Sequence, residues 1–218
     1  MNDGVMHNTV MYTGQVPRAA DPAIRTALVE RAAEMLARRE PVTLRALVDA
    51  SGTSTMAVYT HFGGMPGLWQ AVRREGFLRL NERLATVGAT SDPVRDLAAL
   101  GAAYAQNALQ NPHLYRSMFD EYAELSDPAE AAEGFQRLVS AAARARESGR
   151  FSRDVVPEAV ATRLWAAGHG LITLVLTGVL AEDSIDSHGP VLATAVFLEA
   201  GDEPERCRRS VRTGWSSR

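Results

Sequence analysis

The sequence predicts an all-α protein, and two observations predict it. Apolar residues recur at three- and four-residue spacing along most of the chain, which is the pattern of helices with one buried face. Pro follows Asp where several of these segments begin, at Asp21-Pro22, Asp92-Pro93 and Asp127-Pro128. A capping carboxylate followed by Pro in the first turn is typical of a helix start. We find no segment that alternates as a strand does, and no internal repeat.

The first helix is predicted after an irregular N-terminal segment. Residues 1–20 mix Gly, Asn, Thr and Pro without periodicity, so we expect a mobile arm there. Asp21-Pro22 then begins a helix, Leu28 and Ala32 belong to its apolar face, and Pro41 ends it.

Two short helices separated by a tight turn form the most informative stretch. Thr43 caps the first of them, and Gly52 ends it through a left-handed turn. The second, Ser54–His61, buries Val58 and leaves hydroxyls, a small side chain and aromatic rings for other surfaces. A major groove admits one helix, hydroxyls read base edges there, and methyl groups contact thymine. The stretch therefore predicts a helix-turn-helix that reads DNA.

A long helix is predicted after Gly63-Gly64, and further helices follow it. They begin at Pro93, His113, Pro128, Glu158 and about Ser187. The helix from Glu158 to about Leu180 is apolar nearly all round in its second half, which indicates burial on more than one side. Residues 203–218 are polar and hold five Arg, so we expect a disordered tail.

These elements predict an N-terminal three-helix helix-turn-helix domain that a long helix joins to a C-terminal helical ligand-binding and dimerisation domain. The expected boundaries are an arm at 1–20, a DNA-binding domain at 21–66, a regulatory domain at 67–202 and a tail at 203–218.

The charge is unevenly distributed along the 218 residues, of which 46% are hydrophobic. The net charge is −3, but residues 1–90 hold ten Arg against eight acidic residues, whereas residues 91–218 hold thirteen Arg against eighteen. All 23 basic residues are Arg. A mildly basic N-terminal third on an acidic body suits a localised contact with nucleic acid.

Other sequence features restrict the cellular compartment and the cofactors that we expect. The single cysteine, Cys207, cannot form an internal disulfide or a Cys-rich metal site, so a reducing compartment fits. The N-terminus lacks the features of a signal peptide. The longest apolar run, Leu171–Leu180, is about half the ~20 residues that a membrane span needs. We expect a soluble, cytoplasmic protein without membrane contact, metal or other cofactor.

The segment Ala32–Val72 resembles the DNA-binding domain of TetR/AcrR-type repressors. The resemblance rests on the turn T-L-R-A-L-V-D-A-S-G and on V-Y-T-H-F before a Gly-containing break. It implies DNA contacts from Thr43, Arg45, Ser54, Thr55, Met56, Ala57, Tyr59, Thr60 and His61. The family usually has a phosphate-binding Lys at the start of the next helix, where this chain has Met65-Pro66. The backbone amides of that helix start are an alternative phosphate site.

Three of these residues also have an alternative interpretation that involves no contact with DNA. His61 would be an ordinary surface residue, Tyr59 a core residue and Met56 an exposed residue without a thymine partner. We favour phosphate or base contacts for His61 and Tyr59, because the DNA backbone passes the end of a recognition helix.

The segment Leu164–Leu171, L-W-A-A-G-H-G-L, is similar to the C-terminal regulatory domain of some TetR-type proteins, in which a Trp precedes a His-Gly. The segment Asn111–Phe119 adds to this resemblance. It implies an effector pocket lined by Tyr104, Met118, Phe119, Tyr122, Trp165 and His169. Trp165 and His169 lie four residues apart on one helix face. The alternative for His169 is a core histidine paired with a backbone or side-chain partner.

We therefore expect a ligand-responsive transcriptional regulator, a repressor by the common mode of the family. It would bind a palindromic operator of double-stranded DNA as a homodimer through the helices at 158–180 and 187–200, and a small, largely apolar effector would release it. The alternative is an all-α ligand-binding or structural protein with a vestigial helix-turn-helix. No nucleophile elbow, phosphate-binding Gly loop or paired carboxylates favour an enzyme.

Overall fold

A computed structural model describes residues 21–119 and 128–216 of the chain. The predicted arm at residues 1–20 and the predicted pocket residue Tyr122 lie outside these ranges. The described residues form helices and no strand, which confirms the all-α prediction. The helices are α1 (Pro22–Ala37), α2 (Leu44–Ser51), α3 (Thr55–Phe62), α4 (Met65–Ala85), α5 (Pro93–Gln110), α6 (Pro112–Met118), α7 (Pro128–Glu147), α8 (Pro157–Leu176), α9 (Ser184–Glu199) and α10 (Pro204–Trp215).

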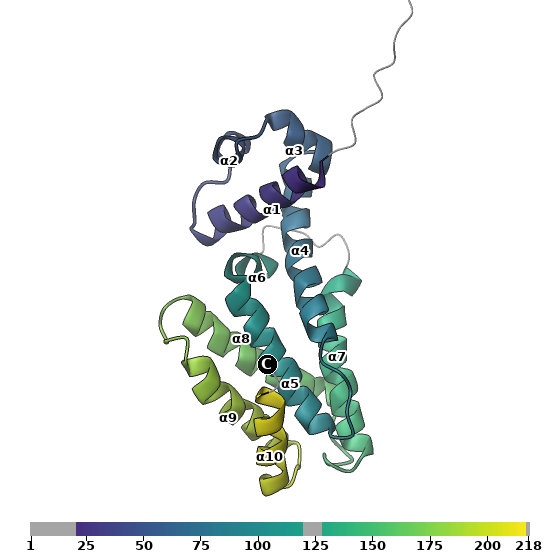
Figure 1. Ribbon diagram of the computed structural model, residues 1–218. Helices are drawn as coiled ribbons and strands as arrows, with labels where there is room; N and C mark the ends of the chain where they lie inside the picture. The colour runs from purple at the N-terminus through teal and green to yellow at the C-terminus, as the bar shows by residue number, and fades with distance from the viewer. Residues whose placement is uncertain (1–20, 120–127, 217–218) are drawn as a thin grey trace, which may run out of the picture.

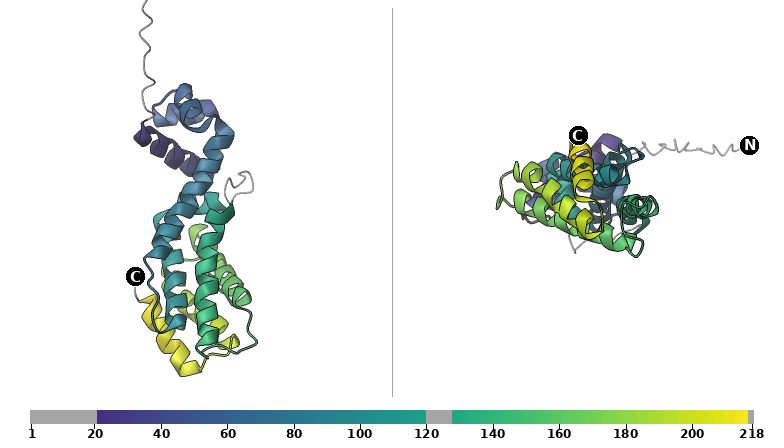
Figure 2. Two further views of the ribbon diagram at one scale, coloured as in Figure 1. Left: turned by 90° about the vertical axis from the view of Figure 1, so that its right-hand side faces the viewer. Right: turned by 90° about the horizontal axis from the view of Figure 1, so that it is seen from below.

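The helices form an elongated molecule with a small N-terminal and a larger C-terminal part (Figures 1 and 2). Helices α1, α2 and α3 gather at one end, and α4 runs from them into a bundle that contains α5 and α7 to α10. Each part has a hydrophobic core of its own. The smaller core joins Leu28, Leu47 and Val58 to Leu68 and Val72 at the start of α4.

The predicted helix caps account for where the helices begin and end. Asp21 accepts a hydrogen bond from the Ala23 amide at 2.9 Å, and Asp92 accepts from the amides of Val94 and Arg95 at 3.2 Å. Gly52 ends α2 with a positive φ of 63°, a conformation that costs a glycine little. Local sequence signals thus set the boundaries before any tertiary packing.

Helix α6 connects the two parts. Leu114 is buried in the N-terminal core, whereas Met118, one turn further, is buried in the C-terminal core. Gly76 on α4 makes room for this helix, since a Cβ there would lie 2.4 Å from Cγ of Met118. Arg79 of α4 adds a polar link, because it pairs with Glu30 of α1 and donates to Asn111 before α6. Helices α1, α4 and α6 therefore form one packed junction.

The chain departs from the sequence prediction at the end of α8. We expected this helix to reach about Leu180, but it ends at Leu176 because Gly178 turns the backbone with a positive φ of 76°. Helix α8 is long and apolar enough to cross a membrane, with a mean hydropathy of 1.4, yet a helix of a soluble bundle passes the same test. It packs against α5, α7 and α9 here.

The predicted disordered tail at 203–218 is wrong for residues 204–215, which form α10. Its start is encoded locally: Glu203 accepts hydrogen bonds from the amides of Glu205 and Arg206, and Pro204 occupies the first turn. Cys207, Val211 and Trp215 then place a buried stripe against α5 and α9. Burial raises the pKa of the Cys207 thiol to about 12, so it stays protonated at neutral pH.

A buried ion-pair network fixes the end of the bundle farthest from the N-terminal part. The Arg150 guanidinium, whose side chain is 1% exposed, donates to both carboxylate oxygens of Asp202 at 2.8 and 2.7 Å. It also donates to Asp92, which accepts from Ser210 of α10 at 2.5 Å. Burial alone would raise the pKa of Asp92, but the bonds from Ser210 and the Arg95 amide and the charge of Arg150 lower it. The start of α5, the loop after α7 and the start of α10 are thereby tied together.

The substitution Asp202→Asn tests this network. It removes one of the two carboxylates that pair with the buried Arg150 guanidinium, and it keeps the side-chain volume nearly unchanged. We therefore expect a loss of about 3 kcal/mol in the free energy of unfolding. The matched control is Glu205→Gln, which removes the same charge from an exposed pair with Arg208 and should cost less than about 1 kcal/mol. Urea unfolding at one protein concentration measures both. Equal effects would show that the buried network does not stabilise the fold.

Candidate DNA-binding surface and effector cavity

The helix-turn-helix is held in shape by its own hydroxyls and glycines. Thr43 Oγ1 accepts from the Ala46 amide at 3.2 Å, and Ser54 Oγ accepts from the Ala57 amide at 3.3 Å. Both of these predicted DNA contacts therefore also cap the helices that they begin. Gly52 supplies the turn between α2 and α3.

Helix α3 exposes one face and buries the other. Val58 is fully buried, whereas Met56 is 69% and Tyr59 is 56% exposed. Thr55 and Thr60 are exposed as well. Large apolar and aromatic side chains in solvent on a short helix are not explained by the core of the protein, and they match the composition of a groove-reading face.

Two of the predicted base and phosphate contacts are less accessible. Ala57 is half-buried and packs in part against the N-terminal core. His61 is half-buried and lies beside Phe62, with ring centroids 6.0 Å apart. Arg45 of α2 is freely exposed, and its ion pair with Asp49 is long at 3.9 Å, so the guanidinium can turn to another partner.

A glycine that the sequence analysis did not single out fixes α3 relative to α4. A Cβ at Gly67 would lie 1.9 Å from the carbonyl oxygen of Phe62, so only glycine lets the first turn of α4 sit on the end of α3. Gly64 caps α4 with a φ of 124° and without a side-chain hydrogen bond. Met65, which stands in place of the expected Lys, packs in part against the N-terminal core.

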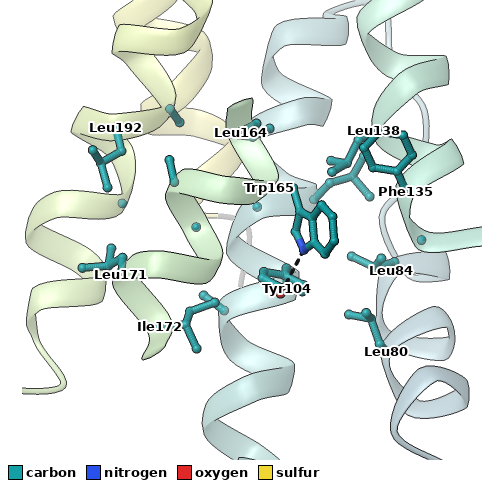
Figure 3. A pocket seen from close by; sticks show the side chains of 18 of the residues that line it. Leu80, Leu84, Tyr104, Phe135, Leu138, Leu164, Trp165, Leu171, Ile172 and Leu192 are labelled. Atoms are coloured by element: carbon teal, nitrogen blue, oxygen red, sulfur yellow. Dashed lines mark hydrogen bonds between the residues drawn. The ribbon is translucent and has the colours of Figure 1, made fainter. Parts of the chain in front are cut away.

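The C-terminal bundle encloses a cavity of about 280 Å³ (Figure 3). Its lining is almost wholly apolar and comes from every helix of the bundle. The larger side chains around it are Phe77, Leu80, Leu84, Leu100, Tyr104, Met118, Phe119, Phe135, Leu138, Leu164, Trp165, Leu171, Ile172, Ile185, Leu192 and Trp215. A volume and lining of this kind suit a small molecule with a largely apolar body.

Arg73 lines the cavity and donates from Nε to the Met118 carbonyl at 2.9 Å, and the other polar groups there belong to one hydrogen-bonded cluster. The Trp165 indole N–H donates to Oη of Tyr104 at 3.1 Å, the bond drawn in Figure 3. Oη of Tyr104 lies 2.9 Å from Oη of Tyr115, which lies 2.8 Å from Nδ1 of His169. Burial raises the pKa of both tyrosines, so both hydroxyls stay protonated. The cluster joins α5, α6 and α8.

His169 lies on the far side of this cluster from the cavity. Burial lowers its pKa, so the ring is neutral near pH 7. It faces a surface groove of about 540 Å³, which Arg116 of α6, Leu36 of α1 and Arg39 in the turn after α1 also line. The sequence left two interpretations of His169 open, a residue of the effector pocket or a core histidine with a hydrogen-bond partner. The structure shows Tyr115 as a partner of His169 and does not place His169 on the cavity wall.

The cavity thus collects some of the predicted pocket residues and adds others. Tyr104, Met118, Phe119 and Trp165 line it, and His169 does not. The sequence analysis missed the contribution of α4 and α9 and the ring of Trp215. Phe77 and Leu84 follow the apolar spacing of a core-facing helix, but spacing does not tell which core residues border a space. Among the described residues, no group of three His, Cys, Asp or Glu side chains gathers as a metal site needs.

The substitution Tyr104→Phe tests whether the polar cluster stabilises the bundle. It deprives the Trp165 indole and the Tyr115 hydroxyl of a shared partner, at a cost of about 1–2 kcal/mol. We expect the unfolding midpoint, followed by circular dichroism, to fall by roughly 2–8 °C. Tyr59→Phe removes the same atom from an exposed ring and should leave the midpoint unchanged. A midpoint that is the same in both variants would contradict the role of the cluster.

Comparison with known proteins places this architecture. Residues 97–196 match the family of tetracyclin repressor-like C-terminal domains. Among curated proteins no match is found.

Solved structures share the fold over most of the chain. A protein with unknown function from Rhodococcus sp. RHA1 has a TM-score of 0.69 and 23% identity, over 86% of this chain and 100% of that one. The TetR family transcriptional regulator PfmR from Thermus thermophilus has a TM-score of 0.65 and 18% identity, over 81% and 99%. The complex of SmeT with triclosan has a TM-score of 0.62 and 20% identity, over 81% and 91%. Residues 97–196 thus match the tetracyclin repressor-like C-terminal family, and the chain shares the fold of solved TetR family regulators over most of its length.

Proposed function

We propose that the protein is a transcriptional repressor that binds a palindromic operator as a homodimer and is released by a small, largely apolar effector. The observation that carries the proposal is the exposed face of α3, with Met56 and Tyr59 in solvent on the second helix of a helix-turn-helix. Thr55, Met56 and Ala57 are proposed to face bases, the first two from exposed positions. Tyr59, Thr60 and His61 follow toward the phosphates or base edges.

The DNA backbone would be held by groups around α3. Arg45 is exposed on α2, and Thr43 and Ser54 begin α2 and α3. The start of α4 adds the amides of Met65 and Gly67, since Gly64 brings no side-chain cap and Pro66 has no N–H. Amides at a helix N-terminus attract phosphate, which would compensate for the family's missing Lys.

The effector would occupy the cavity of the C-terminal bundle. Its wall is apolar except for Arg73 of α4 and the cluster at Tyr104 and Trp165, so it favours a molecule with an apolar or aromatic body and at most a few polar groups. The solved complex of SmeT with triclosan, a protein of the same fold, is consistent with such an occupant.

Release would follow from the helices that the cavity shares with the DNA-binding part. Phe77, Leu80 and Leu84 line the cavity from α4, and Leu68 and Val72 of the same helix belong to the N-terminal core. An effector that fits better when α4 and α6 are displaced would shift the population toward that state. The two readers of a dimer would then lose the spacing that the operator requires.

Dimerisation is proposed through α8 and α9. Leu174 on α8, Val179 in the following turn and Val191 on α9 are 43%, 67% and 63% exposed. An apolar face of this kind suits a self-complementary four-helix contact with a second copy. Helix α8 is strongly apolar, and its own bundle buries only part of it. The proposed dimer contact would cover apolar surface that the bundle leaves exposed.

The remaining assignments follow the same reasoning. A cytoplasmic location suits a regulator that must reach DNA. Regulators of this family are generally not enzymes, and the expectation that this chain has no catalytic activity stays a prediction. We propose a DNA-binding domain at 21–66 and a regulatory domain that begins at 67 and extends to Trp215. The presence of two cores supports this division, and the smaller core also takes in Leu68 and Val72 of α4 and Leu114 of α6.

The recognition-helix assignment is tested with an operator that the wild-type chain selects from a random duplex pool. Thr55→Ala and Tyr59→Ala each remove a proposed contact from both protomers, and we expect each to weaken binding about tenfold or more. Thr213→Ala, at an exposed position on α10 outside the proposed DNA and dimer contacts, is the matched control and should bind as the wild type does. Electrophoretic mobility shifts at fixed salt measure the dissociation constants.

The salt dependence of binding in the same assay distinguishes a working DNA reader from a vestigial helix-turn-helix. Phosphate contacts release counterions, so a working reader binds random duplex DNA more weakly as salt rises. A flat salt response together with unchanged binding of both α3 variants would overturn the proposed function.

The dimer interface is tested by Val191→Arg. A buried, unpaired guanidinium at the centre of an apolar contact is strongly unfavourable, so we expect the dimer to dissociate to the 23.6 kDa monomer in sedimentation velocity. Val156→Arg carries the same change at an exposed position just before α8 and outside the proposed face. A dimer that survives Val191→Arg places the interface elsewhere.

A further inference from the structure

Helix α10 places a tryptophan ring between two glycines at the cavity. Trp215 is 9% exposed and lines the cavity beside Gly101 of α5 and Gly189 of α9. A Cβ at Gly189 would lie 2.2 Å from Cζ2 of the indole, whereas one at Gly101 would lie 3.4 Å from Cζ3, an ordinary contact. At Gly189, therefore, any larger residue would displace the ring.

The same ring separates the cavity from the outside of the bundle. Trp215 also lines a surface groove between α9 and α10, together with Pro190, Val191 and Thr194. Within the described chain it is the one residue that borders both spaces. Removing the indole would therefore join the cavity to the groove.

The position of the ring is fixed by the packing of α10. A Cβ at Gly214 would lie 2.2 Å from the carbonyl oxygen of Arg95, so the glycine lets α10 lie directly against α5. Ser210, one turn earlier, bonds to Asp92 within the buried network. Val211 is 2% exposed. Because these contacts hold α10 along its length, the Trp215 ring has a fixed position in the cavity wall.

We propose that Trp215 sets the size limit of the effector by closing the cavity on the side where α5 and α9 face each other. The inference rests on the proposed function, because it takes the cavity to be the effector site. The ligand class is a molecule with an apolar body that ends against the indole. A molecule whose apolar part is longer than the closed cavity is rejected by this ring.

Linear primary alcohols from hexanol to tetradecanol serve as the probe, with isothermal titration calorimetry on the full chain. Each methylene that enters the cavity should strengthen binding about fourfold. In the wild type this gain should stop at the alcohol that reaches Trp215. In Trp215→Ala it should continue to longer alcohols, so that the longest ones bind at least tenfold more tightly than to the wild type. Trp215→Phe, with a smaller ring, should lie between the two and replaces the alanine variant if that one does not fold.

Two glycine substitutions form a matched pair. Gly189→Ala should displace the indole and change the chain length at which the gain stops. Gly101→Ala adds the same methyl group at ordinary contact distance on the opposite side of the ring and should leave that chain length unchanged.

The outcomes separate this inference from the proposed function. If the wild type and the Trp215 variants stop gaining affinity at the same chain length, Trp215 is not the limiting wall, although the cavity still binds. If no alcohol binds the wild type at all, the cavity is not a ligand site, and the effector part of the proposed function fails together with the inference.

Discussion

The packing of α6 between the two cores is the constraint on which the rest of the structure depends. Leu114 and Met118 lie one turn apart on the same short helix, yet they are buried in different cores. Gly76 lets this helix lie close against α4, and the Arg79–Glu30 pair ties α4 to α1. A displacement of α6 cannot stay local, because close-packed side chains on both sides must follow it.

The distribution of polar contacts favours movement at this junction over movement elsewhere. At the far end of the bundle, the buried pair Arg150–Asp202 and the nearly buried Asp96, which accepts from Arg144 at 2.8 Å, are costly to separate. At the junction, Tyr115 of α6 makes neutral hydrogen bonds, and the charged groups there, Arg73 bonded to the Met118 carbonyl and Arg79 paired with Glu30, are only partly buried. Neutral hydrogen bonds rearrange at a smaller cost than buried ion pairs. A molecule bound in the cavity would therefore displace the junction at α6 more readily than the far end of the bundle, where the buried ion pairs lie.

Local chemistry made much of the fold predictable from the sequence. Asp21, Thr43 and Gly52 act through their own neighbours, so the beginnings and ends of helices could be predicted without tertiary information. The end of α8 was missed because Gly178 interrupts an apolar run that otherwise continues. Helix α10 was missed because the polar composition of residues 203–218, with five Arg, outweighed the stripe formed by Cys207, Val211 and Trp215, although that stripe was present in the sequence.

The candidate sites were predictable only in part, for a different reason. The exposed face of α3 follows from one helix and its pattern. The cavity instead depends on how helices from distant parts of the chain fail to fill a shared space. Residue type drew attention to Trp165 and Tyr104, but no spacing rule distinguishes Phe77 or Leu84 from other core residues. The same limit applies to His169, whose neighbour Tyr115 comes from another helix.

The absence of a side chain at Gly67 has a mechanical consequence. Only Gly63 and Gly64 separate α3 from α4, and the close approach of Gly67 to the Phe62 carbonyl restricts the motion of one helix relative to the other. Leu80 lies thirteen residues beyond Gly67, which is about 20 Å along an α-helix. A tilt of α4 by roughly 10° about its cavity end would thus carry the reading helix some ~3 Å sideways. Over the two arms of the proposed dimer, such a rotation would be comparable to the rise of about one to two base pairs along the DNA axis.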